Sequence, residues 1–259
     1  MAEDKVEDTI ESRRFGGVSR LYGADLRARF QQARVVVAGL GGVGSWAAEA
    51  LARTGVGHLI LIDFDHIAQS NTNRQLHALD GQYGKAKVQA MSERIRQINP
   101  DIKLTVCDSF LGPENLDILI PQDALVLDAT DSVETKIALV IWATQNNRSL
   151  VMCGAAGGKT DPTSVRCDDL SRTEQDALLA KVRQGLRQDH GFSRNLKKKM
   201  GVRAIYSQEP RAGASTGGLA CSGYGSTVMV TAACGLAAAA EILNLIAMPP
   251  SSDTFKKYA

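Results

Sequence analysis

The feature that most constrains the fold of this chain is the glycine-rich run GLGGVG that begins at Gly39. It directly follows RVVVA, a run typical of a buried strand, and precedes a helix-like stretch, WAAEALARTG. In such a strand–turn–helix unit, Gly39 permits the tight turn, Gly41 lets a phosphate approach the backbone, and Gly44 lets the helix pack close to the strand. The run therefore predicts a nucleotide site that also includes Gly42. A glycine-rich turn without a ligand is the alternative.

Apolar runs and helical spacing alternate along the first 155 residues. Strands are expected at 34–38, 58–63, 102–107, 124–128 and 149–153, and helices at 46–55, 85–98 and 133–145. The alternation predicts an α/β fold, a Rossmann-like, doubly wound and mostly parallel sheet. Residues 156–259 read as a mixed C-terminal extension of the same domain, with a helix over 171–188 that Ser171 would cap and Glu174 would support.

Polar side chains follow the ends of the expected strands. Asp63 is placed to bind a ribose hydroxyl, which suits a nicotinamide oxidoreductase and an ATP enzyme equally. Arg74 and Lys87 suit a polyphosphate, and Lys87 lies at a helix start, where a lysine is unfavourable unless an anion lies nearby. Asp131 suits Mg²⁺, which proteins bind through one or two carboxylates. Each residue alone is an ordinary surface group, but together they favour triphosphate chemistry over hydride transfer.

Four segments, GLGGVG, D-F-D…S-N-x-x-R-Q, G-x-x-K and L-D-A-T-D-S, resemble the ubiquitin-activating-like, ThiF/MoeB/HesA-type adenylating superfamily over about residues 10–155. The resemblance implies that residues 1–155 form an ATP-binding adenylation domain. It implies that Asp63 contacts ribose and that Asp131 holds Mg²⁺. The other side chains expected at ATP are Asp65, Asn71, Arg74 and Lys87.

The same resemblance implies a homodimer in which an arginine near the N-terminus is donated to the partner's site. Arg20 is the first candidate and Arg14 the second, because the spacing in RRFGGVSRLYG departs from the usual pattern. The expected catalytic groups are therefore Arg74, Lys87, Asp131 and Arg20. The Ala-rich segment Val228–Ala247 is apolar over twenty residues, yet its single charge, Glu241, favours a buried or interface helix over a membrane span.

Further blocks, including RFGGVSRLYG, ERIRQINP and C-S-G-Y-G, are similar to the tRNA threonylcarbamoyladenosine dehydratases within that superfamily. The resemblance implies ATP-dependent cyclisation of threonylcarbamoyladenosine at position 37 of tRNA through an acyl-adenylate. Adenylation of a ubiquitin-like sulfur-carrier protein is the alternative. Members that act on such carriers commonly have two Cys-x-x-Cys zinc knuckles, and the five cysteines here form none, so no structural zinc is expected.

A basic stretch gives the tRNA interpretation a place on the chain. Residues 181–203 carry eight lysines and arginines against one acidic residue, in a chain whose net charge is only +2. The candidates for tRNA phosphates of the anticodon arm are Arg194, Lys197, Lys198, Lys199 and Arg203. A solvated basic loop is the alternative. Sulfur-transfer accessory proteins are possible further partners.

The cysteines and the remaining composition add three expectations. An odd number of cysteines without a secretory signal indicates reduced thiols and a cytoplasmic protein. Cys221, in the Gly-rich stretch 208–225, is a candidate acyl-accepting thiol, with an inert cysteine as the alternative, and that stretch is a candidate lid. An aromatic content of 5% argues against a broad stacking platform for the tRNA base.

Overall fold

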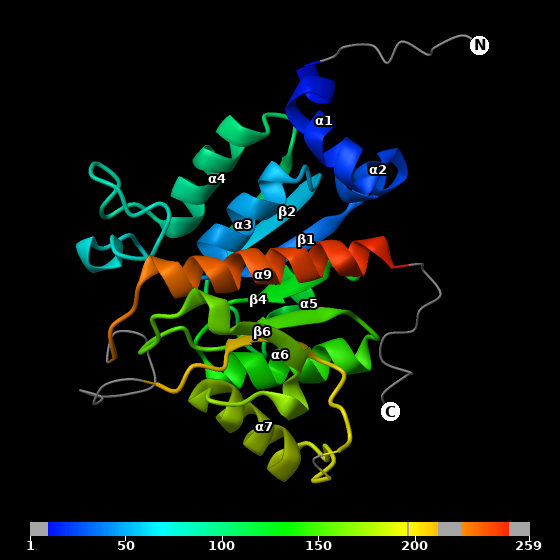
Figure 1. Ribbon diagram of the computed structural model, residues 1–259, viewed down its shortest axis with the longest axis vertical. Coiled ribbons are helices and arrows are strands. Elements are labelled where there is room, and N and C mark those ends of the chain that lie inside the picture. The colour runs from blue at the N-terminus through cyan, green and yellow to red at the C-terminus, as the bar shows by residue number, and fades with distance from the viewer. Residues whose placement is uncertain (1–9, 196, 212–223, 249–259) are drawn as a thin grey trace.

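The fold is built on one seven-stranded sheet (Figure 1). The computed structural model describes residues 10–195, 197–211 and 224–248. The strands are β1 (Arg34–Ala38), β2 (His58–Asp63), β3 (Lys103–Asp108), β4 (Leu125–Asp128), β5 (Leu150–Cys153), β6 (Val165–Asp169) and β7 (Arg203–Ser207). Their order is β3-β2-β1-β4-β5-β7-β6, and every pair is parallel except the antiparallel pair β6–β7. The mostly parallel, doubly wound α/β prediction is confirmed.

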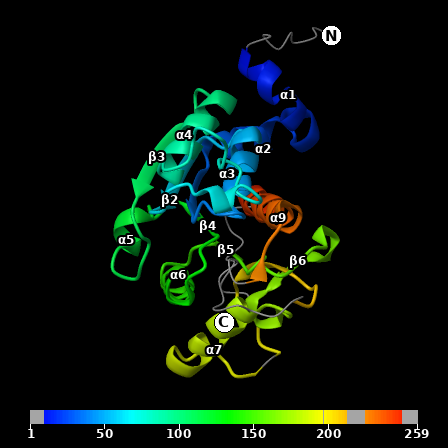
Figure 2. The ribbon, with the colours of Figure 1, turned by 90° about the vertical axis from the view of Figure 1, so that its left-hand side faces the viewer.

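Helices cover both faces of this sheet (Figure 2). They are α1 (Ile10–Tyr22), α2 (Ala24–Gln32), α3 (Gly44–Arg53), α4 (Lys87–Ile98), α5 (Leu116–Leu119), α6 (Val133–Gln145), α7 (Ala177–Asp189) and α9 (Val228–Ala247). Short 3₁₀ turns lie at η1 (Gln69–Asn71), η2 (Pro162–Ser164) and η3 (Leu170–Arg172). One apolar core includes residues of α3, α4 and α9, and a second includes residues of α6 and α7.

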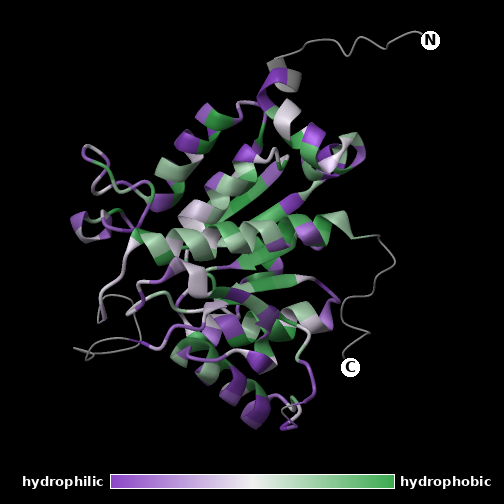
Figure 3. Ribbon diagram, in the orientation of Figure 1, coloured by the Kyte–Doolittle hydropathy of each residue, from purple (hydrophilic) through white to green (hydrophobic). Residues whose placement is uncertain are grey.

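Successive residues of each central strand enter opposite cores. In β1, Val35 and Val37 belong to the core under α3 and α9, whereas Val36 and Ala38 belong to the core over α6 and α7. Because both faces are covered, the strands are apolar throughout instead of alternating with polar residues. Figure 3 shows this as hydrophobic strands in the middle of the molecule, with hydrophilic residues on the outer helices.

The apolar helix α9 crosses the face of the sheet. It packs against α3 and against strands from β4 to β7, and Val230, Cys234, Ala238 and Ile242 are buried in the core. A methyl group at Gly235 would meet the carbonyl oxygen of Val43 at 2.4 Å, so the glycine allows the two helices to approach. By length and composition α9 alone among the described helices could cross a membrane, but half of it is buried within this fold. One face of it belongs to the core, which fits the expectation of a buried or interface helix.

The C-terminal extension completes the same sheet, since β7 pairs with β5 and β6 pairs with β7. Two expectations for this part are wrong. Ser171 does not cap a helix; it lies in η3, and α7 begins later, with the Asp176 carboxylate accepting from the Leu179 N–H. Strands β6 and β7 were not predicted. Most of the candidate lid at 208–225, together with Cys221, lies outside the described residues.

Candidate active site

The glycine-rich turn after β1 is held in a conformation that only glycine fits at two positions. Gly39 has φ +83°, and a methyl group there would meet the Ala129 carbonyl oxygen at 2.8 Å. A methyl group at Gly44 would lie 1.8 Å from the Gly39 carbonyl oxygen, so this glycine lets α3 start directly against the strand. A methyl group at Gly41 would meet nothing within 4 Å, because this residue faces an open pocket. The tight turn at Gly39 and the close packing at Gly44 have the expected geometry, and the approach of a phosphate to Gly41 stays a prediction.

The Asp63 carboxylate ties the turn to the loop after β2. It accepts hydrogen bonds from the Leu40 N–H at 2.5 Å and the Asp65 N–H at 2.8 Å. Burial raises the pKa of Asp63, although the nearby Lys87 ammonium acts in the opposite direction. The side chain lines the pocket at the end of β2, where a ribose hydroxyl would meet a carboxylate already oriented by two backbone donors.

Lys87 begins α4, as expected, and the anion beside it comes from the protein. Its ammonium lies 2.6 Å from the Asp65 carboxylate and 4.0 Å from that of Asp63, and the side chain is almost fully buried. Neighbouring Lys85 is committed elsewhere, in an ion pair with Glu93. Lys87 therefore sits behind the acidic loop and does not line the pocket wall. Its ammonium is occupied by Asp65, whose side chain is half-exposed.

Asn71 and Arg74 come from the irregular segment at η1 and both line the pocket. The Asn71 side chain is buried and accepts from the Ala68 N–H at 3.0 Å, which closes the η1 turn. The Arg74 guanidinium donates to the Ser70 carbonyl at 2.9 Å and to the Asn73 side chain at 3.0 Å. The backbone carbonyl of Arg74 accepts a hydrogen bond from the Trp46 indole N–H of α3. Arg74 is thus anchored from both ends while remaining at the pocket.

A buried ion pair supports the turn after β4. Asp128 and Lys136 are both fully buried, with 2.9 Å between carboxylate oxygen and ammonium nitrogen. The other Asp128 oxygen accepts from the N–H and the hydroxyl of Thr130, at 3.0 and 2.7 Å. The next residue, Asp131, is exposed and lines the pocket. Lys136 was missed from sequence because a lysine within an apolar helix gives no signal of its partner.

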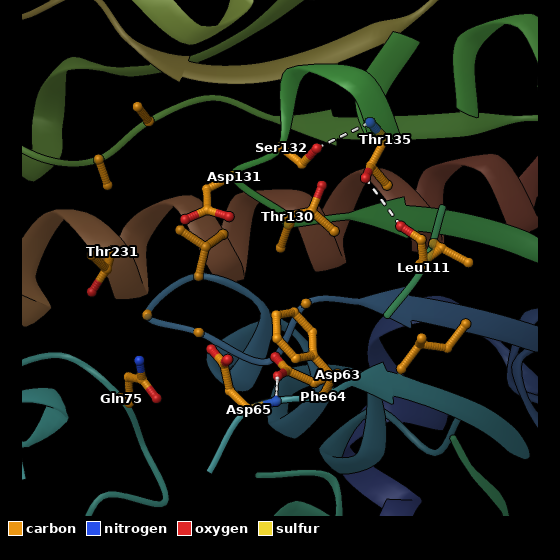
Figure 4. Close-up of a pocket in the computed structure, with 18 of the residues that line it drawn as sticks. Asp63, Phe64, Asp65, Gln75, Leu111, Thr130, Asp131, Ser132, Thr135 and Thr231 are labelled. Atoms are coloured by element: carbon orange, nitrogen blue, oxygen red, sulfur yellow. Dashed lines mark hydrogen bonds between the residues drawn. The ribbon is translucent and has the colours of Figure 1, made fainter. Parts of the chain in front are cut away.

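These groups surround one pocket of about 250 Å³ at the carboxyl ends of the central strands. Figure 4 shows Asp131 on one side of it and Asp63 and Asp65 on the other, with the glycine turn between. Of the residues expected at ATP, those lining the pocket are Gly39, Gly41, Gly42, Asp63, Asp65, Asn71, Arg74 and Asp131. Gly44 and Lys87 support it from behind. This is the edge of an open α/β sheet at which ligands bind.

An aromatic pair at the pocket was not expected. Phe64 and Phe110 line it with ring centroids 5.4 Å apart in an edge-to-face contact, and both rings are about half exposed. Phe64 follows Asp63 and Phe110 lies beyond β3, so the pair stands beside the expected ribose position. The low aromatic content of the chain gave no indication of this pair, because two rings are enough to form an apolar wall for a base.

The far wall of the pocket includes Gly154, Ala155 and Ala156 after β5. The Asp176 carboxylate, which caps α7, also accepts from the Ala155 N–H at 2.8 Å. Lys159 is fully buried and donates to the carbonyls of Ser207 and Gln175, at 2.6 and 3.1 Å. The extension therefore positions one wall of the pocket, which sequence spacing did not indicate.

The basic stretch lies at the end of the sheet opposite the pocket, where the parallel strands begin. Arg194, Lys197 and Lys198 are exposed on the segment between α7 and the start of β7, and Lys199 is half-buried. Because β7 runs parallel to β5, this segment is at the amino ends of the strands, across the sheet from the pocket. Arg203 is not available to a ligand in this arrangement, since it pairs with Glu241 of α9.

The N-terminal arginines also lie away from the pocket. Arg20 is exposed near the end of α1, which Figure 1 shows beyond the far end of α4, and neither it nor Arg14 lines the pocket of its own chain. Within the described residues, no group of three or more His, Cys, Asp or Glu side chains could hold a metal ion. Asp131 is thus a single carboxylate, sufficient for Mg²⁺ only when phosphate oxygens supply further ligands.

Comparisons with known proteins identify the family of the chain. The model of the ThiF family matches residues 14–259. The chain is 45% identical over 240 residues to the tRNA threonylcarbamoyladenosine dehydratase of Haemophilus influenzae, covering 89% of this chain and 92% of that one. It superposes on structures of the Escherichia coli tRNA N6-threonylcarbamoyladenosine dehydratase with AMP (TM-score 0.84, 44% identity) and with ATP (0.83, 45%), each covering 91% of this chain and 94% of the other. A molybdopterin-synthase adenylyltransferase of Escherichia coli is 37% identical over 119 residues, 46% of this chain and 48% of its own length.

Proposed function

The chain belongs to the ThiF family, and on that premise we propose that it catalyses the ATP-dependent cyclising dehydration of N6-threonylcarbamoyladenosine at position 37 of tRNA. The observation that carries this is the match to dehydratases over about nine-tenths of both chains, whose structures hold ATP and AMP. The pocket supports the same conclusion, because its acidic, amide and arginine side chains surround a glycine turn open to phosphate.

ATP binds with its phosphates at the turn beside Gly41 and with its ribose at Asp63. The pair Phe64 and Phe110 provides an apolar wall for adenine next to that carboxylate. Arg74 faces the phosphates, and Lys87 adds positive charge behind Asp65. Mg²⁺, when bound, would be held by Asp131 and phosphate oxygens and would neutralise charge on the phosphates.

In the first step, a carboxylate oxygen of the threonyl group attacks the α-phosphorus. A bond forms between them, the bond from the α-phosphorus to the bridging oxygen breaks, and pyrophosphate leaves with that electron pair. The product is an acyl-adenylate, in which AMP replaces oxide as the leaving group. Arg74 and the arginine donated by a partner subunit, Arg20 in our assignment, stabilise the charge that develops on the phosphates.

In the second step, a nucleophile of the same substituent attacks the activated carbonyl. The new bond closes the ring, the carbonyl–oxygen bond to AMP breaks, and the nucleophile loses its proton to solvent. Because both groups belong to one substituent, the step is intramolecular and gains the corresponding entropic advantage. The loop wall at Gly154, Ala155 and Ala156 is where this substituent would lie against the nucleotide.

The decisive experiment incubates the protein with ATP and tRNA that carries threonylcarbamoyladenosine. We expect pyrophosphate and AMP in equal amounts, with the cyclic nucleoside detected by mass spectrometry of digested tRNA. ADP and phosphate as products would exclude adenylation. Turnover of a sulfur-carrier protein with no change in tRNA would instead support the carrier-activating alternative, which the half-length match to a molybdopterin-synthase adenylyltransferase keeps as the second candidate.

The wider setting follows from the same proposal. The protein acts in the cytoplasm as a homodimer, in which Arg20 reaches the pocket of the partner subunit. Arg194, Lys197, Lys198 and Lys199 contact phosphates of the anticodon arm from the amino edge of the sheet, remote from the reacting base. Cys221 as an acyl acceptor and sulfur-transfer proteins as accessory partners remain separate proposals; loss of turnover in Cys221→Ala with intact ATP and tRNA binding would require the thiol.

A further inference from the structure

A second cavity, of about 400 Å³, opens at the end of the molecule where α3 and α4 finish. It is lined by Arg14, Phe15, Arg53, Arg94, Gln97 and Ile98. None of these residues lines the nucleotide pocket. Arg14 is the second candidate for the arginine donated to a partner subunit, a role that the mechanism above assigns to Arg20. We propose that this arginine cavity binds a phosphate group, either of the tRNA backbone or of a free phosphate anion.

One buried carboxylate holds two of the arginines in place. Glu49 is only 9% exposed. Its carboxylate accepts a hydrogen bond from Arg53 Nε of the same helix at 2.9 Å, with Arg53 Nη2 in an ion pair at 2.8 Å, and it accepts from Arg94 of α4 at 2.5 and 3.1 Å. Hydrogen bonds to Arg94 and Arg53 lower the pKa of Glu49 against the effect of its burial, so the carboxylate is ionised at neutral pH. The guanidinium groups are thereby fixed before any ligand arrives, which reduces the entropic cost of binding.

The cavity keeps an excess of positive charge and unused donors. Three arginines face one carboxylate, so two positive charges are uncompensated among its lining residues. Each of Arg53 and Arg94 bonds Glu49 through Nε and Nη2, and neither Nη1 has a partner among the described residues. The Arg14 guanidinium forms no hydrogen bond or ion pair within the described part of the chain. Guanidinium groups with free N–H donors are the side chains best suited to phosphate oxygens.

The remaining wall is rigid. Phe15 is 4% exposed, and the Arg27 guanidinium stacks 4.7 Å from its ring centre while donating to the Gly55 carbonyl at 3.2 Å. An arginine in the last turn of a helix also offsets the helix dipole, which accounts for Arg53 taken alone. It does not account for the convergence of three guanidinium groups from α1, α3 and α4 on one hollow.

The distance to the nucleotide pocket suits an RNA that occupies both sites. Helix α3 has 10 residues and begins at the phosphate turn, so at about 1.5 Å per residue the cavity lies about 15 Å along the helix from that turn. This is about four to five steps of a stacked strand at about 3.4 Å per step. A backbone phosphate a few nucleotides from the reacting base would therefore fall within reach. For the RNA source, the inference rests on the proposed function.

The test compares Arg53→Gln with wild type and with a control, Arg96→Gln, which removes an exposed arginine of the neighbouring helix α4 that does not line the cavity. In Arg53→Gln the Glu49 carboxylate keeps Arg94, so the fold should persist; Arg53→Lys restores the charge. One arm measures binding of fluorescently labelled tRNA from about 50 to about 300 mM KCl, concentrations on either side of the physiological value. The other arm measures the rise in Tm with inorganic phosphate alone.

If the bound phosphate belongs to RNA, Arg53→Gln should weaken tRNA binding about 3- to 10-fold and reduce the slope of log Kd against log salt concentration by about one. Arg53→Lys should then be intermediate, and Arg96→Gln should be close to wild type. A free anion predicts unchanged tRNA binding but a phosphate-induced rise in Tm that Arg53→Gln loses. Equal behaviour of wild type, Arg53→Gln and Arg96→Gln in both arms overturns the proposal. Failure of the proposed function is separate: it would appear as wild-type protein that binds tRNA without forming the cyclic nucleoside.

Discussion

Removal of the Lys136 ammonium is the sharpest test of how the turn after β4 is built. In Lys136→Met the Asp128 carboxylate stays in a position with no solvent exposure and loses its cation, 2.9 Å away in the wild type. Breaking one partner of a buried ion pair costs about 3–5 kcal/mol of unfolding free energy, because the remaining charge is uncompensated. For 259 residues, at about 2.1 cal/mol/K per residue, this lowers Tm by about 6–9 °C.

The assay is urea unfolding at pH 7, followed by circular dichroism, with Lys181→Met on the exposed face of α7 as the matched control. We expect Lys181→Met to stay within about 0.5 kcal/mol of wild type. The double variant Lys136→Met/Asp128→Asn buries no charge and keeps an oxygen for Thr130, so it should recover to within about 2 kcal/mol of wild type. A loss below about 1 kcal/mol in Lys136→Met, or a double variant less stable than the single one, would refute the buried-charge argument.

Four further outcomes follow from the site. Gly41→Ala should keep the wild-type Tm within about 1 °C but lose ATP-dependent pyrophosphate release. Gly44→Ala should unfold at a markedly lower temperature, because its methyl group overlaps the Gly39 carbonyl. Equal Tm values for the two variants would contradict this contrast. Asp131→Asn should lower kcat about 100-fold without a change in Tm, since the side chain is exposed, and unchanged kcat would remove it from the reaction. Burial, with the charges of Lys87 and Arg94, lowers the pKa of His77 to about 4, so the unfolded chain binds more protons than the folded one between about pH 6.5 and 4. The free energy of unfolding should therefore fall by about 2–3 kcal/mol as pH drops through that window. In urea titrations, His77→Gln should flatten this pH dependence. Leu236→Arg, on the exposed face of α9, should shift sedimentation toward the monomer if that face is in the dimer interface, and an unchanged sedimentation coefficient would place the interface elsewhere.

The N-terminal half of the fold was predictable because local pattern and tertiary position agree there. β1, β2 and α6 have the predicted bounds, and α3 ends at a left-handed glycine, Gly55, as expected. β6 was missed because VRCDD has no apolar run: it is an antiparallel edge strand, and its residues are mostly part-exposed. The start of α7 was misplaced because Ser171 and Asp176 are both capping residues by type. Only the contact of Asp176 with the loop after β5 distinguishes them.

For the site, sequence reasoning found groups that line the pocket and missed those that hold the pocket walls in place. Asp63, Arg74 and Asp131 are found because each follows a strand end or lies in a dense polar loop. Asp176 and Lys159 act through partners 21 and 48 residues away, and Lys136 pairs with a strand residue eight positions earlier; no spacing encodes these pairings. The basic stretch was identified by charge alone, so Arg203 was grouped with its neighbours although Glu241, 38 residues away, neutralises it.

The position of α9 has a consequence for how the chain folds during synthesis. This last described helix covers the strands from β4 to β7 and seals the core beneath α3. At about 5–20 residues per second, about 90 residues separate the end of β5 from the end of α9, so roughly 5–20 s pass before the core can close. Until then the nascent sheet exposes an apolar face, and its native pairings are of high contact order and slow to form. The nucleotide pocket therefore cannot mature before α9 has been synthesised, and a chain truncated before α9 should be chaperone-dependent and aggregation-prone.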